Sequence, residues 1–152
     1  MAISIWSVSI TYAPIEFASQ KHDGAAGAVV DFFGIVRAQE GDRVITGIEY
    51  EANTAMAEHQ LNAIAEKAAT DFALSRIIIT HRVGLVKAAE PSLFLRVESA
   101  HRSAAFSASA WIIDELKQRV PIWKRPVFAT GREHEREVEK VTAPSAESSL
   151  PA

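Results

Sequence analysis

Apolar residues occur in this chain at two spacings, one typical of strands and one typical of helices. Segments of the two kinds follow one another along the chain, and this order is the feature that most restricts its possible folds. Five stretches are rich in β-branched and aromatic residues, which is typical of strands. We therefore predict strands at residues 3–11, 27–37, 44–51, 76–83 and 93–98. The longest run is GAVVDFFGIVR, and Gly34 indicates an interruption within it.

Two further stretches repeat their apolar residues at the 3.6-residue spacing of an α-helix. The first covers residues 55–72, and Asn53 or Thr54 is suited to cap it. The second ends at Pro121, and we expect its apolar face to hold Phe106, Ala110, Ile113, Leu116 and Val120. A short helical turn is expected at residues 15–21. This mixture predicts an α+β fold with largely antiparallel strand pairing.

The length of 152 residues suits one domain, which we place at residues 1–142. Residues 143–152 (APSAESSLPA) have the composition of a disordered tail. The chain has no cysteine, which excludes disulfides and a catalytic thiol and is typical of the reducing cytoplasm. Its first residues show neither a signal-peptide pattern nor an apolar run long enough for a membrane span, so we expect a cytoplasmic protein.

The charge balance limits the partners of the chain. Lys and Arg total 16 against 19 Asp and Glu, and a net charge of −3 argues against nucleic acid as a partner. An anion site must therefore be a local cluster, and cations gather between His101 and Arg125. The five histidines lack the spacing of a metal site, and no glycine pattern matches a nucleotide-binding loop. We expect neither a metal nor a cofactor.

Two lysines lie near the end of the second predicted helix. Lys117 stands one turn beyond Ile113, so its stem can pack on apolar surface while its ammonium faces a cleft. Lys124 follows Pro121 and can fold back towards Lys117. Ammonium groups that lie close together release protons more easily, which suits proton transfer or covalent chemistry. The alternative is a pair of solvated surface lysines, since lysine is seldom buried.

Three more cationic side chains are candidates for an anion site. His101 and Arg102 lie where a predicted strand meets the second helix, and helix N-termini favour phosphates. Alternatively, Ser99 or Ser103 caps this helix and both side chains face water. Arg37 ends the longest apolar run, either at the rim of a site or simply where the strand meets solvent.

Five blocks of the sequence occur in a recognisable order: GAVVDFFGIVR (27–37), IEYEANTAMAEHQL (48–61), HRVG (81–84), SAHRSAAF (99–106) and LKQRVPIWKR (116–125). Together they resemble the large-subunit family of molybdopterin synthases, the MoaE family, over about two-thirds of the chain. The SAHR element and the paired lysines are the most specific parts. The resemblance implies an α/β-hammerhead fold and a homodimer. It also implies one small ubiquitin-like sulfur-carrier subunit at each end, making a heterotetramer.

The activity that the resemblance implies is sulfur transfer. A thiocarboxylate at the C-terminal Gly-Gly tail of the carrier would deliver sulfur to cyclic pyranopterin monophosphate, and two deliveries would form the dithiolene of molybdopterin. The absence of cysteine agrees with sulfur that arrives on a partner.

The resemblance also implies site residues. Lys117 and Lys124 match two catalytic lysines, and we expect Lys117 to orient the thiocarboxylate and Lys124 to transfer a proton. Positions that bind substrate are matched by Ile35, Val36, Arg37, His101, Arg102 and Arg125, and positions of the pocket wall by Phe32 and Ile113. Fixed cations in a water-poor pocket would stabilise the charge that develops as sulfur attacks.

Two departures from the family pattern leave other functions open. Pro126 stands where the family usually has glutamate, and the family's later ending with tryptophan is not evident after Gly131. A divergent paralogue that binds a carrier tail without catalysis is therefore one alternative. A phosphate-ester enzyme that needs no carrier is another.

Overall fold

The structure is a computed structural model, and it describes residues 4–16, 22, 24–129 and 139–140. Of the helical turn expected at 15–21, residues 15 and 16 have no regular structure, and the rest lie outside the described residues. The tail expected at 143–152 also lies outside them, and the single domain at 1–142 stays a prediction. Neither described helix is long and apolar enough to cross a membrane.

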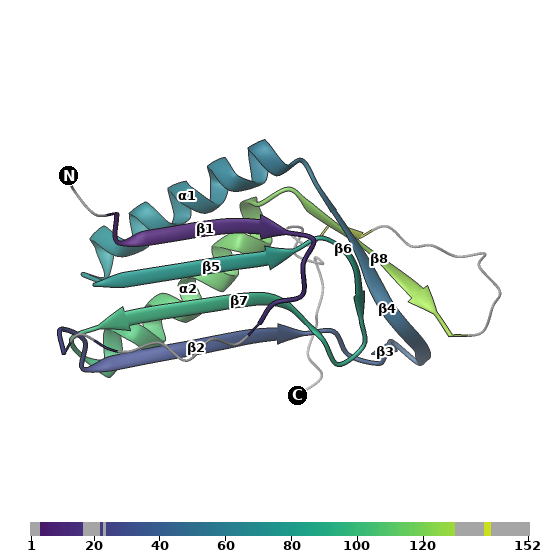
Figure 1. Cartoon of the computed structure of the whole chain (residues 1–152), viewed down its shortest axis with the longest axis horizontal. Helices are drawn as coiled ribbons and strands as arrows, with labels where there is room; N and C mark the ends of the chain where they lie inside the picture. Colours follow the sequence, from purple (N-terminus) through teal and green to yellow (C-terminus); the bar gives the residue numbers. More distant parts are fainter. Residues whose placement is uncertain (1–3, 17–21, 23, 130–138, 141–152) are drawn as a thin grey trace, which may run out of the picture.

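A four-stranded sheet forms the body of the molecule (Figure 1). Its strands lie in the order β1 (Trp6–Thr11), β5 (Arg76–Arg82), β7 (Pro91–Ser99) and β2 (Ala28–Ile35). Only the β1–β5 pair is parallel among these neighbours. Strands were predicted over all four segments, and the largely antiparallel α+β fold is confirmed.

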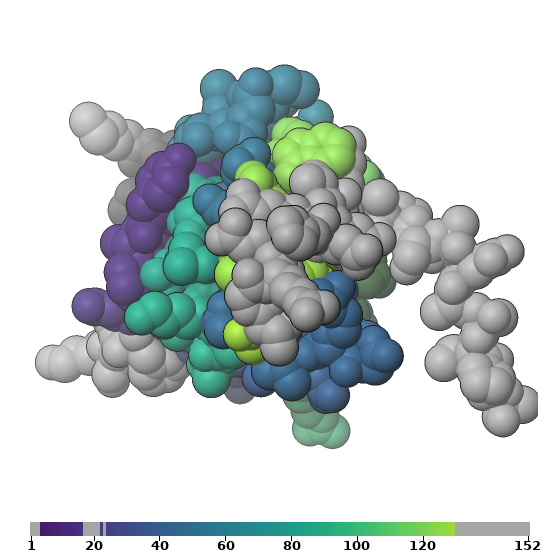
Figure 2. All heavy atoms as spheres, turned by 90° about the vertical axis from the view of Figure 1, so that its right-hand side faces the viewer, coloured from purple at the N-terminus to yellow at the C-terminus, as the bar shows by residue number. Residues whose placement is uncertain are grey.

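A second sheet crosses one end of the first (Figure 1). It contains β3 (Gln39–Glu40), β4 (Arg43–Ala52), β8 (Ile122–Phe128) and β9 (Glu139–Lys140), and β6 (Gly84–Lys87) pairs with β4. Figure 2 looks onto this end, where the blue spheres of β3 and β4 reach the surface. The sequence predicted β4 but neither β6 nor β8.

Both helices cover the same face of the first sheet, which is the far face in Figure 1. Helix α1 (Thr54–Asp71) begins at Asn53, whose side-chain oxygen accepts a hydrogen bond from the Met56 amide at 3.2 Å. Its buried side chains include Leu61 and Ile64, as the 3.6-residue spacing predicted. They meet sheet residues that are also fully buried, among them Ile77, Ile79, Leu95 and Val97.

Helix α2 (Arg102–Arg119) confirms part of the predicted apolar face, since Leu116 and Val120 are buried and Ile113 packs against the core. Phe106 is 62% exposed and Ala110 is exposed, so these two assignments are wrong. The buried positions are Ala105, Ala108, Ser109, Ile112 and Leu116. Small residues along this stripe allow the helix to lie close to the sheet, which the large side chain of Phe106 would prevent. The helix ends before Pro121, as expected.

Candidate functional site

Two neighbouring cavities open where the two sheets meet, and they share a wall made by Ile35, Tyr50 and Lys124. The larger has a volume of about 180 Å³ and also contains Lys117, so we name it the lysine chamber. The smaller, of about 120 Å³, also contains Arg37, and we name it the arginine chamber.

The lysine chamber combines two ammonium groups with an apolar wall. Lys117 comes from the last turn of α2 and is exposed, whereas Lys124 comes from β8 and is half-buried. The chain reverses after α2, and this reversal returns Lys124 to the cavity that Lys117 lines. Phe32, Ile35 and Ile113 lie in its wall, so the structure brings five of the expected site residues together here.

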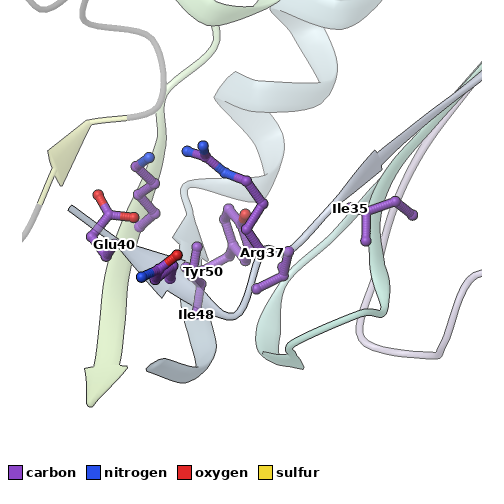
Figure 3. A pocket seen from close by; sticks show the side chains of 8 residues that line it. Ile35, Arg37, Glu40, Ile48 and Tyr50 are labelled. Carbon is purple, nitrogen blue, oxygen red and sulfur yellow. The ribbon is translucent and has the colours of Figure 1, made fainter. Parts of the chain in front are cut away.

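The arginine chamber is more polar. Arg37 follows the end of β2, and in Figure 3 its side chain lies between Ile35 on one side and Glu40 on the other. The strand runs through Gly34 without a break, contrary to the predicted interruption, and its pairing with β7 shifts register only between Gly34 and Ile35. Val36 is then held by two backbone hydrogen bonds, to Glu90 at 3.0 Å and from Ala89 at 2.7 Å.

A chain of hydroxyl groups lies along the back of the lysine chamber. The Tyr50 hydroxyl lies 3.4 Å from Ser92 Oγ, and Ser92 Oγ donates to the Gly34 carbonyl at 3.3 Å. Burial raises the pKa of Tyr50, although its hydrogen bond with Ser92 and the charge of Lys124 act in the opposite direction. The phenol is therefore uncharged at neutral pH.

His81 stands beside Tyr50 in the same wall, with the two rings edge to face at a centroid distance of 5.4 Å. Its Nδ1 lies 2.8 Å from the Arg82 carbonyl oxygen, which can only accept, so Nδ1 carries the proton. Burial lowers the pKa of His81 to about 4. This histidine is neutral at pH 7, and the positive charge of the lysine chamber comes from Lys117 and Lys124.

His101 and Arg102 are not brought to either chamber within one chain. They are exposed at the first residues of α2, whereas Lys117 lies near its last. At 1.5 Å per residue, the helix separates the two ends by about 22 Å. The alternative prediction is right that both side chains face solvent, but its serine cap is wrong, because His101 is the N-cap without a side-chain bond and Ser99 Oγ donates to the His101 carbonyl.

Arg125 and Pro126 follow Lys124 in β8. The Arg125 side chain pairs with Glu51 at 2.6 Å and lines neither chamber. Pro126 is buried opposite Ile48, and the strand continues through it to Phe128. Within the described ranges, no group of three or more metal-binding side chains occurs.

The sequence alone did not indicate Tyr50 or Ser92 as part of the site, and His81 was placed only in a strand. All three are inward-facing strand residues, and their approach depends on how the two sheets meet. Tyr50 and His81 do lie in two of the quoted sequence blocks, which was the one available signal.

Comparisons with known proteins agree in sequence and in structure. Residues 10–119 match the MoaE protein family. The chain is 39% identical over 118 residues to the molybdopterin synthase catalytic subunit of Thermoplasma volcanium, covering 78% of this chain and 86% of the relative. It is 37% identical over 133 residues to the subunit of the same name from Oryza sativa subsp. indica, covering 86% and 69%.

Solved structures show the same fold. The molybdopterin synthase structure from Staphylococcus aureus matches with a TM-score of 0.75 and 28% identity, over 86% of this chain and 94% of that one. A complex of subunits 1 and 2 of the molybdopterin-converting factor from Helicobacter pylori contains a chain that matches with a TM-score of 0.61. The match has 20% identity and covers 88% of this chain and 95% of that one, so this likeness concerns the fold alone.

Proposed function

The chain belongs to the MoaE protein family, and from this membership we propose that it is the catalytic subunit of a molybdopterin synthase. It takes sulfur from the C-terminal thiocarboxylate of a small ubiquitin-like carrier and transfers it to cyclic pyranopterin monophosphate, which forms the dithiolene. The observation that carries this proposal is the pair of neighbouring chambers with Lys124 in their shared wall.

The two chambers suit the two reactants of this transfer. The lysine chamber has the apolar wall that a peptide tail needs, and Lys117 there can orient a thiocarboxylate. The arginine chamber offers Arg37 to the anionic phosphate of the pterin. Lys124 borders both chambers, so it is placed to transfer a proton and to stabilise charge where the reactants meet.

A homodimer explains the position of His101 and Arg102. These two side chains lie about 22 Å along α2 from Lys117, too far to reach the same small substrate within one chain. A second copy of the chain would supply them to the rim of the pocket. Each copy would also hold one carrier, as the resemblance to the family implies. We expect this assembly to work in the cytoplasm.

Reconstitution tests the proposal. A carrier that ends in Gly-Gly is first used to capture the chain, and the thiocarboxylated carrier is then supplied together with cyclic pyranopterin monophosphate. We expect dithiolene formation that requires the carrier. Capture without dithiolene would instead indicate a non-catalytic paralogue, and phosphate-ester cleavage without any carrier would indicate a stand-alone enzyme.

Lysine variants test the site. Removing one preorganised cation from a developing charge typically costs about 100-fold in kcat. We therefore expect a loss of that size for Lys117→Ala and for Lys124→Ala. Lys87→Ala is the matched control, because Lys87 is an exposed lysine of β6 that lines neither chamber. Near-normal turnover of Lys117→Ala with preformed thiocarboxylated carrier would rule out its role.

A further inference from the structure

Arg82, the last residue of β5, holds together the segment that leads from β5 to β7. Its Nη1 donates to Glu90 Oε2 at 2.6 Å, and its Nη2 donates to the Leu85 carbonyl at 3.3 Å. Leu85 lies in β6, and Glu90 directly precedes β7. A single guanidinium group therefore contacts both halves of residues 83–90 and closes this connection.

The turn at the end of this segment holds the neighbouring chain. The Ala89 amide donates to the Val36 carbonyl at 2.7 Å, and the Val36 amide donates to the Glu90 carbonyl at 3.0 Å. Ala89 has a φ of 72°, a conformation that costs a residue with a Cβ about 1 kcal/mol and persists only where surrounding contacts enforce it. The ion pair between Arg82 and Glu90 is such a contact, because it fixes the residue that follows Ala89.

The position of Arg37 depends on this turn. Val36 directly precedes Arg37, and on the other side the Ala38 carbonyl accepts a hydrogen bond from the Ile45 amide at 3.0 Å. The Arg37 side chain, by contrast, makes no hydrogen bond or ion pair with any residue that the structure describes. Its direction into the arginine chamber (Figure 3) is therefore set mainly by the backbone of residues 36–38.

The burial of Arg82 indicates a role in geometry and not in stability alone. Its side chain is 11% exposed, and its Nε is buried without a hydrogen-bond partner among the described residues. Removing a charge from water costs free energy, and apolar residues in place of a buried ion pair often leave stability unchanged or higher. The arginine fork instead provides two contacts of fixed direction, to a carboxylate and to a carbonyl, which a lysine cannot make together.

We propose that the ion pair of Arg82 and Glu90 positions Arg37 in the arginine chamber, so that both members of the pair are positioning residues. The pair fixes the turn at residues 88–90, and the turn fixes Val36 through two backbone hydrogen bonds. The proposal rests on the proposed function for the identity of the anion, which is the phosphate of the pterin. An anchored arginine loses less freedom when the phosphate binds, so its affinity is higher. The two lysines of the lysine chamber come from α2 and β8, so the chemical step should not depend on the pair.

The test uses Glu90→Ala and, as a second variant, Arg82→Lys, which keeps the charge but not the fork. Asp71→Ala is the matched control. It also removes the carboxylate of an ion pair, with Lys67 at 2.8 Å, but this pair lies in α1 and lines neither chamber. The first measurement needs no turnover: hydrogen exchange of single amides in the whole chain, followed by NMR.

Exchange of the Val36 amide is compared with that of the Ile79 amide, which reports the stability of the whole sheet because β5 is paired on both sides. We expect Val36 to accelerate about 10-fold more than Ile79 in Glu90→Ala and in Arg82→Lys, as for the loss of one hydrogen bond to a charged group, and not in Asp71→Ala. An unchanged Val36 amide would overturn the proposal. Equal acceleration of both amides would also overturn it, because the pair would then only stabilise the fold.

The second measurement is steady-state kinetics with the thiocarboxylated carrier. A loosened Arg37 should raise the KM for the pterin about 10-fold in both variants, with kcat and the KM for the carrier within about twofold. An unchanged KM for the pterin would overturn the proposal, and so would a fall in kcat alone. An unaltered chain without turnover would contradict the proposed function instead, and the exchange measurement would still decide the role of the pair.

Discussion

Acid should destabilise this protein through His81, because the folded chain holds this side chain neutral. The pKa of His81 is lowered by burial to about 4, whereas an unfolded histidine titrates near 6.5. As the pH falls below 6.5, His81 binds a proton in the unfolded state but not in the folded state. The contribution of neutral His81 to the free energy of unfolding is therefore fully present above pH 6.5 and decreases between pH 6.5 and 4. Below pH 4 this group causes no further change.

The size of the effect follows from the two pKa values. A difference of one pKa unit corresponds to about 1.4 kcal/mol, so the full loss through His81 approaches about 3 kcal/mol. At pH 5 the loss relative to pH 7 is about 2 kcal/mol. For a chain of this length, such a loss lowers the melting temperature by about 4–8 °C.

Urea denaturation at pH 7, 6 and 5, followed by tryptophan fluorescence, measures this loss. Carboxylates also contribute to acid sensitivity, so the informative quantity is the difference between the unaltered chain and His81→Asn. Asparagine cannot titrate and can still donate to the Arg82 carbonyl. We expect the variant to be less stable at pH 7 but to lose about 2 kcal/mol less than the unaltered chain between pH 7 and 5. His59→Asn, at an exposed position of α1, is the control. Equal losses in His81→Asn and the unaltered chain would refute the argument.

Three further substitutions should each lower the stability of the fold. Asn53→Ala removes the side-chain cap of α1 and should cost about 1 kcal/mol in chemical denaturation. Gly47→Ala would place a Cβ 2.6 Å from the Val86 carbonyl oxygen, so we expect a lower melting temperature and weaker hydrogen-exchange protection along β4 and β6. Asp31→Asn removes the carboxylate that pairs with the buried Arg96 at 2.6 Å and should cost about 2 kcal/mol, less than for a fully buried pair because Asp31 is 22% exposed.

The first sheet could be predicted because its strands carry their own signal. In β7, Leu93, Leu95 and Val97 alternate with residues of the opposite face, and this spacing is visible without any knowledge of neighbours. Strand β8 has no such signal. It contains Lys124, Arg125 and Pro126, a poor composition for a strand, and its conformation depends on pairing with β4.

The candidate site was only partly predictable for a similar reason. The resemblance indicated Lys117 and Lys124, and the structure places both in one chamber. Tyr50 is more than sixty residues from either lysine in the sequence, so its approach depends on the pairing of β4 with β8. His101 and Arg102 were grouped with the lysines because cations gather between His101 and Arg125 and because the resemblance implies that both bind substrate. The length of α2 separates them, as the rise of an α-helix would have indicated.

The span of α2 has a genetic consequence for a two-copy assembly. Each α2 would serve one active site with Lys117 and the other with His101. In a mixed pair of one Lys117→Ala chain and one His101→Ala chain, both lesions would fall in the same site, leaving the other site intact. Two inactive variants, combined, should therefore recover up to half of the activity per mixed pair, as in complementation between two mutant alleles.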